Sequence, residues 1–410
     1  MKRILLVSII VLLAIGPYAE EKDTVQVEPQ IKLELVWEKE FESPISDFTL
    51  NIAKDDKSYP NVVVLGSKVV ILDDKGKKSI KIKGLEGGSD FFSISESGNH
   101  IIHSRWHHDK DGKEVEECIV HIYDLTGKLL WKTPNIAPAR YPKLSPNGEY
   151  LVGTSWAEIL LVKKDGTSKF INPRQNKRRM LMRIFFSISG NSEFWGISFG
   201  EPYADESVQV ITYTPDGGEI WRKVTEPMGL AYELEISNNG EMLGVVSPEK
   251  GKNFFYLFNR KGNLLWRAGE ISRTNHRIVF SPSDNYVLVA DFGGDFKLFD
   301  TSSGKEIWHH HIAKGTEKID VDQDPGIGFI PYMEITISDD ENFVIVGGRN
   351  SKTNANCLLA FDRRRGIVNT FSIPSSNGGY LPKTKFAPAG DYLYVANGDK
   401  LLKYAVRRGK

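Results

Sequence analysis

The chain has 410 residues, 40% of them hydrophobic and 11% aromatic, which is enough apolar material for a large buried core. Its 53 acidic and 53 basic residues give a formal net charge of zero, so no global field draws it to nucleic acid or to anionic lipid. The two cysteines, Cys118 and Cys357, are too few for a disulfide scaffold.

The first expected element is a secretory signal peptide. Two basic residues precede an apolar run at 4–15, in which Ser8 is the one polar residue, and small or polar residues follow it. The run is short for a membrane span, and Ala19 is a suitable last residue of the signal. An uncleaved anchor is the alternative, because Pro17 lies close to that cut. We therefore expect a secreted or periplasmic protein organised as a signal peptide at 1–19, a linker at 20–31 and one folded domain at 32–410.

One sequence motif, the first phrase of the repeat, then recurs along the chain: an apolar strand that ends in a small residue, a tight turn and a second apolar strand. The turns are rich in Pro, Asn, Gly and Asp, which suit hairpins. Instances are LSPNGEYLVG (144–153), FSPSDNYVLV (280–289) and FAPAGDYLYV (386–395), with further copies at 94–103, 188–197, 236–245 and 337–346. The small residue recurs at intervals of 44 to 57 residues, as serine at 95, 145, 189, 237, 281 and 338 and as alanine at 387.

A second phrase follows each copy of the first. It has an apolar strand, an acidic residue or Asn, a glycine turn and an apolar pair that often ends in Trp. It reads IYDLTGKLLW (122–131), TYTPDGGEIW (212–221), LFNRKGNLLW (257–266) and LFDTSSGKEIW (298–308), with weaker copies at 71–80, 161–170 and 360–371. Together the phrases make a meander of four strands, a to d. A repeat of this length with four short strands and no helix predicts a β-propeller blade.

The number of copies sets the expected architecture. A degenerate copy at 47–76 brings the count to eight; if it were a separate strand pair, the ring would have seven blades. The eighth copy, at 384–407, lacks strand d, and the unmatched KLELVWEKEF at 32–41 supplies one. We therefore predict an all-β fold, a single propeller of eight four-stranded blades closed by an N-terminal strand that completes the C-terminal blade. Such closure removes an open sheet edge.

The pattern resembles the WD-repeat and quinoprotein (PQQ-like) β-propellers over about residues 32–408. The Gly-Lys-apolar-apolar-Trp ending at 127–131, looser at 304–308, is similar to the quinoprotein repeat. The resemblance implies eight blades with the Trp packed between neighbouring blades. The WD dipeptide is replaced by Tyr123-Asp124, Phe299-Asp300 and Phe361-Asp362, so the hydrogen-bond network of WD repeats is not expected.

Structural roles account for most of the conspicuous residues. The large indole rings share one repeat position, with no more than one in a blade, and so spread around the ring, which favours packing between blades over a cofactor stack. They are Trp37, Trp131, Trp221, Trp266 and Trp308. Cys118 and Cys357 fall in blades 2 and 7, three steps apart, so we expect buried thiols and no disulfide.

Three patterns could carry chemistry, and each lacks a required part. GISFG at 196–200 matches a hydrolase nucleophile elbow, but no helix is expected after Ser198. Asp320, Asp322 and Asp324 alternate as in a calcium loop, yet the sequence lacks the Gly and Glu that an EF-hand needs, so calcium is a weak expectation. The histidines at 309–311 and 107–108 have no third zinc ligand at a recognisable spacing. No cofactor is predicted.

Length variation is concentrated in the b-to-c and d-to-a connections, which share one face of a propeller. Loops on a rigid scaffold commonly carry binding residues, and Arg and aromatic residues dominate interface hot spots. The candidate binding residues on this long-loop face are Arg105, Trp106, His107, Arg178, Arg179, Tyr203, Asp205, Asp322 and Arg349.

We expect an exported, non-catalytic scaffold that binds a protein or peptide through this face. It would not bind nucleic acid, and it would meet the membrane only through an uncleaved anchor. The alternative is a propeller enzyme, either a quinone-dependent dehydrogenase or a lyase or hydrolase, with its site at the centre of the ring.

Overall fold

The computed structural model describes residues 31–408, and within some strands it describes the backbone alone. The segments outside the description are 52–60, 66–68, 74, 82–90, 96, 109–113, 135–139, 155–157, 174–181, 201–206, 228–232, 250–251, 272–275, 292–294, 312–333, 350–355, 365, 374–381 and 388. No helix is assigned in the described residues, so none of them forms a helix that could cross a membrane.

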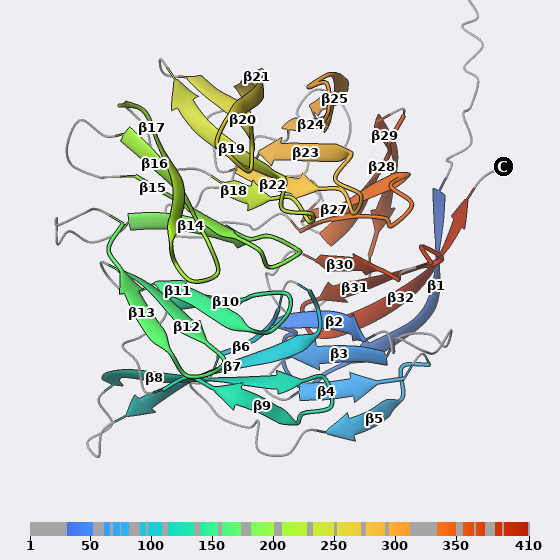
Figure 1. Cartoon of the computed structure of the whole chain (residues 1–410). Coiled ribbons are helices and arrows are strands. Elements are labelled where there is room, and N and C mark those ends of the chain that lie inside the picture. The colour runs from blue at the N-terminus through green and yellow to red at the C-terminus, as the bar shows by residue number, and fades with distance from the viewer. Residues whose placement is uncertain are drawn as a thin grey trace, which may run out of the picture.

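The described residues form 32 strands in eight four-stranded sheets, as expected (Figure 1). Blades 1 to 4 contain β2 (Asp47–Asn51), β3 (Asn61–Leu65), β4 (Val69–Leu72), β5 (Lys78–Lys81); β6 (Phe91–Ile94), β7 (His100–His108), β8 (Glu114–Asp124), β9 (Leu129–Lys132); β10 (Arg140–Leu144), β11 (Tyr150–Thr154), β12 (Ile159–Lys163), β13 (Ser168–Ile171); and β14 (Met182–Ile188), β15 (Trp195–Gly200), β16 (Ser207–Tyr213), β17 (Glu219–Pro227). Blades 5 to 8 contain β18 (Leu234–Ile236), β19 (Met242–Glu249), β20 (Lys252–Asn259), β21 (Leu264–Ile271); β22 (His276–Phe280), β23 (Tyr286–Asp291), β24 (Asp295–Asp300), β25 (Glu306–His311); β26 (Ile335–Ile337), β27 (Phe343–Arg349), β28 (Asn356–Asp362), β29 (Gly366–Ser372); and β30 (Lys383–Phe386), β31 (Tyr392–Asn397), β32 (Lys400–Arg408), β1 (Ile31–Glu40).

Each blade is an antiparallel meander with its strand a nearest the centre of the ring, where the first strands of neighbouring blades meet (Figure 1). The count of eight is confirmed, and the alternative of seven is excluded, because β2 to β5 form a complete sheet of their own. The core lies between the blades. Its apolar clusters join residues of adjacent sheets, as where Ile122 of blade 2 packs with Leu151 of blade 3.

The ring closes through the predicted pairing of the two chain ends. Strand β1 lies antiparallel to β32, from Ile31 opposite Arg408 to Glu40 opposite Lys400. Two ion pairs span this pair of strands, Arg407 with Glu34 at 2.9 Å and Lys400 with Glu38 at 2.8 Å. Because β1 supplies the strand d that the eighth repeat lacks, blade 8 is a full four-stranded sheet.

The tryptophans of the d strands pack between blades, as predicted. Trp131 and Trp308 are each only 8% exposed. Three indole Nε1 atoms donate to main-chain oxygens of the next blade: Trp131 to Gly148 at 3.0 Å, Trp221 to Arg260 at 3.0 Å and Trp266 to Thr301 at 2.7 Å. A Cβ on Gly262 or Gly304 would lie 2.8 Å from the ring of Trp221 or Trp266, and both glycines have positive φ. The repeated Gly therefore serves both the turn and the ring above it.

A one-residue β-bulge precedes this position in seven of the eight blades. In blade 5, Leu257 pairs with Trp266 and Phe258 with Leu264, so Leu265 is the extra residue. The corresponding c–d pairs of blades 1, 2, 4, 6, 7 and 8 carry the same shift, whereas β12 and β13 of blade 3 pair without one.

The face that carries the short a–b and c–d turns is laced by side chains that reach the preceding blade. Ser192, Asp284 and Glu341 have φ of 61°, 62° and 57° at a turn position that is glycine in other blades. Each of these three clamp residues accepts hydrogen bonds from the turn before it: Ser192 from Asn147 N at 3.0 Å, Asp284 from Asn238 N and Asn239 N at 2.8 Å, and Glu341 from Ser283 N at 2.7 Å. These contacts offset the left-handed strain.

The strands bear on two predictions about reactive residues. Ser198 is fully buried in the middle of β15, paired with Phe185 and Val210, so GISFG is strand and no nucleophile elbow. Cys357 is buried at the start of β28, as expected. The side chain of Cys118 lies outside the described residues.

Candidate functional site

Along the inner strands, fully buried residues alternate with half-buried ones. The two sets differ in role: one packs between blades and the other faces the centre of the ring. In β30, Thr384 and Phe386 are buried between blades, while Lys383 and Lys385 are half-buried. In β22 the half-buried residues are Arg277 and Val279. Because side chains of a strand alternate in direction, the half-buried set is the one that faces the centre of the ring.

Charged side chains gather where these inner strands begin, at the end that carries the d-to-a connections. We call this set the charged belt. It consists of Asp47 in blade 1, Glu233 in blade 5, Arg277 in blade 6, Glu334 in blade 7, and Lys383 and Lys385 in blade 8. It lies on the long-loop face.

Ion pairs link the charged belt from blade to blade. Arg277 of blade 6 lies 3.0 Å from Glu233 of blade 5. Lys383 of blade 8 lies 3.8 Å from Glu334 of blade 7 and 3.7 Å from Asp47 of blade 1. From blade 5 through blades 6, 7 and 8 to blade 1, the paired side chains are therefore alternately negative and positive.

Lys385 differs from the other members of the belt. Burial lowers its pKa, and the adjacent positive charge of Lys383 lowers it further, against the opposing influence of Asp47 and Glu334. A lysine held this way is a ready donor and cation for any group that brings a compensating negative charge.

The histidine run on β25 has structural partners. His309 Nε2 lies 3.1 Å from Asp295 Oδ1, and the ring of His310 meets Phe361 edge-on with centroids 5.8 Å apart. Within the described residues, no three His, Cys, Asp or Glu side chains are grouped so that they could hold a metal ion.

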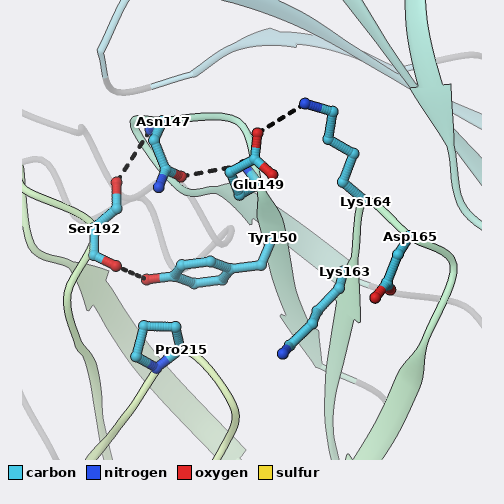
Figure 2. A pocket seen from close by; sticks show the side chains of 8 residues that line it. All are labelled: Asn147, Glu149, Tyr150, Lys163, Lys164, Asp165, Ser192 and Pro215. Atoms are coloured by element: carbon cyan, nitrogen blue, oxygen red, sulfur yellow. Dashed lines mark hydrogen bonds and ion pairs between the residues drawn. The ribbon is translucent and has the colours of Figure 1, made fainter.

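A hollow of about 270 Å³ lies on the opposite, short-turn face between blades 3 and 4 (Figure 2). Tyr150 forms part of its lining and donates its hydroxyl to Ser192 O at 3.2 Å. Lys164 pairs with Glu149 at 2.7 Å, and Lys163 pairs with Asp216. Since its lysines are already paired, this hollow presents little free charge to a ligand.

The structure places only part of the predicted binding set. Arg105, Trp106 and His107 belong to β7 and not to a loop, because β7 and β8 form a long ribbon in which Arg105 pairs with Ile119 and Trp106 with Cys118. Arg349 ends β27 opposite Asn356. The side chains of all four lie outside the described residues. Also outside them are Arg178, Arg179, Tyr203, Asp205 and Asp322, together with the weak calcium candidates Asp320 and Asp324.

Sequence reasoning missed the charged belt. The only signal was the alternation Lys383, Thr384, Lys385 in an innermost strand, where apolar residues are expected. That signal gains meaning once the neighbouring strands are known to bring Asp47 and Glu334 beside it.

Eight meandering blades, of which several dock a d-strand tryptophan on the next blade, define a propeller of the PQQ-like repeat class. Residues 116–410 match the family described as outer membrane protein assembly factor BamB, and this chain belongs to that family. No curated protein matches the chain.

Solved structures show the same fold at low sequence identity. The C-terminal WD40 domain of Sif2 has a TM-score of 0.59 at 13% identity, covering 91% of this chain and 98% of its own. The propeller of Dos1 has a TM-score of 0.59 at 12% identity, covering 91% and 95%. BamB from Moraxella catarrhalis has a TM-score of 0.54 at 11% identity, covering 91% and 100%.

Proposed function

We propose that the protein is an exported, non-catalytic propeller that binds a protein or peptide partner through its long-loop face. The observation that carries this proposal is the charged belt, in which Lys385 is held half-buried beside Lys383, Asp47 and Glu334. Such a cluster weakens the fold unless something else gains from it, because burial of charge costs free energy.

The ribbon of β7 and β8 supports the same face. Its backbone pairing runs from His100 opposite Asp124 to His108 opposite Glu114, so Arg105 and Trp106 stand on hydrogen-bonded strands. Residues on a paired ribbon lose less conformational entropy on binding than residues of a loop. Arg and Trp are the residue types most enriched at interface hot spots.

Family membership supports export and a protein partner. The family description names an outer membrane protein assembly factor, and the sequence begins with the layout of a signal peptide. The partner would place carboxylates against Lys385 and Arg277, and an acceptor or aromatic group against the ribbon.

The test is quantitative capture of partners by the full-length protein. Tagged wild type and the double variant Arg105→Ala, Trp106→Ala are cross-linked in the envelope fraction, purified and compared by mass spectrometry. We expect at least one partner to fall about tenfold or more in the variant, as for loss of a hot spot.

The matched control is Lys128→Ala, Lys261→Ala, which removes two exposed side chains from the c–d turns of the opposite face. It should leave recovery unchanged. Equal recovery by wild type, the control and the long-loop variant would reject this face as the binding surface.

A further inference from the structure

The outer edge of blade 3 differs from those of the other blades. In β13 the pairs run without interruption from Ile159 opposite Ile171 to Val162 opposite Ser168. Each of the other seven c–d pairs contains a bulge, a device that disrupts an edge strand and discourages edge-to-edge pairing. Blade 3 therefore has an edge without this protection.

The missing bulge changes which side chain reaches the next blade. Lys169 pairs with Leu161, the position that Trp266 occupies opposite Leu257 in blade 5. Its amine donates to Gly217 O of blade 4 at 3.0 Å. A one-residue slip turns the following side chain to the other face of the strand. Phe170, which stands in the Trp position of the sequence repeat, is consequently 48% exposed.

The same register identifies the free backbone groups. Lys163 N donates to Thr167 O at 2.8 Å, so the pair closest to the turn is hydrogen-bonded. Antiparallel pairs alternate, which directs the N–H and C=O groups of Ser168 and Phe170 away from β12. In the part of the chain that the structure describes, no strand pairs with this outer side, and β13 is the last strand of its sheet (Figure 1).

We propose that β13 is a docking edge for an extended strand of another polypeptide, which adds to blade 3 and places an apolar side chain beside Phe170. Two outward N–H and two outward C=O groups on an extended edge are complemented by a strand and not by a lipid or a single anion. The flanking charges agree, because Lys164 is already paired with Glu149 (Figure 2). Lys163 is likewise paired with Asp216, so neither lysine calls for a charged ligand. This edge is independent of the long-loop face.

The test uses a fluorescein-labelled peptide, Thr-Val-Thr-Phe-Thr-Val-Thr, and a twin that is N-methylated at alternate residues and cannot donate along one edge. Binding to the full-length protein is followed by fluorescence anisotropy. We expect saturable binding of the first peptide and binding by the twin that is weaker by about tenfold or more, because strand addition depends on main-chain hydrogen bonds. Ser168→Pro should weaken binding similarly, since it removes one outward N–H while proline is tolerated on edges.

Phe170→Ala should reduce affinity by about threefold to tenfold. Leu264→Ala, at a side chain 47% exposed beside a bulge, should change nothing. Equal binding of the two peptides to wild type, or no binding of either at millimolar concentration, overturns the proposal; this comparison needs no variant to fold. Self-association of the wild type that Ser168→Pro abolishes, seen by sedimentation, would assign the edge to a second copy and overturn the partner strand.

Discussion

The two faces of the ring use polar side chains in opposite ways. On the short-turn face, Asp284 and Glu341 accept hydrogen bonds from main-chain donors of the preceding blade. On the long-loop face, burial and Lys383 act against the charge of Lys385. The difference indicates that the short-turn face joins neighbouring blades through main-chain hydrogen bonds, whereas the long-loop face, although ion pairs also cross it, retains a group that costs stability. Changes to each face should therefore move stability in opposite directions.

The largest effect should come from deleting residues 31–40, because both faces depend on a closed ring. Removal of β1 exposes the edge of β32 and takes away the ion pairs of Glu34 and Glu38. We expect loss of a single cooperative unfolding transition, measured by circular dichroism during urea titration. Deletion of 20–30 is the control and should leave the midpoint within error. An unchanged transition for both deletions would show that closure contributes little.

Asp284→Ala should be the most damaging single change on the short-turn face. It leaves the N–H groups of Asn238 and Asn239 without their acceptor. The alanine keeps a Cβ at φ 62°, but no longer has the hydrogen bonds that offset the strain of this conformation. We expect a loss of about 2–4 kcal/mol in the free energy of unfolding. Asp284→Gly should be more stable than Asp284→Ala by about 1 kcal/mol, because glycine relieves the backbone strain at positive φ but does not restore the hydrogen bonds. Equal stability of wild type and Asp284→Ala would show that the hydrogen bonds of Asp284 to the preceding blade do not stabilise the ring.

Lys385→Met should stabilise the protein, in contrast to the clamp variants. The pKa of Lys385 is lowered in the folded state, mainly by burial. Its protonated form therefore penalises folding fully below the folded pKa, and the penalty disappears as pH rises from there towards the unfolded value. We expect a gain of about 1 kcal/mol at pH 7 that shrinks as pH rises towards the ordinary lysine value, measured from urea midpoints. A loss of stability at pH 7 would show that the lysine supports the fold.

The smallest effect should come from adding pyrroloquinoline quinone and calcium. The proposed role as a non-catalytic scaffold provides no site that would gain from them, so under that proposal the melting temperature should shift by less than about 1 °C at ligand concentrations near 1 mM. Thermal unfolding with and without the additives, alongside the absorbance spectrum of the quinone, measures this. A clear shift with a spectral change would favour the alternative of a propeller enzyme.

The sequence predicted the ring because its features are local or repeated. Trp131 and Gly127 recur together at a fixed spacing, so the meander, the blade count and the role of the tryptophans could be inferred. The closing strand could be inferred because Trp37 matched a fourth strand without its first three. These inferences need only the repeat and its turn chemistry.

The remainder depended on register and on neighbours. Phe170 lies four residues after Gly166, as Trp131 does after Gly127, so spacing alone could not show that blade 3 lacks the bulge. Similarly, Lys385 looked like an ordinary strand lysine until the fold put blades 1 and 7 on either side of it. The placement of Arg105, Trp106 and His107 in a connecting loop was also wrong, because cross-strand pairs extend β7 as far as His108.

The pairing of β1 with β32 allows the number of blades in such a ring to change. Blade 8 takes one strand from the start of the chain and three from its end, while every other blade is one continuous segment. Insertion or loss of an internal repeat would therefore change the circumference of the ring and leave the register of β1 against β32 intact. The pairing of β1 with β32 can therefore stay the same while the number of blades changes in evolution.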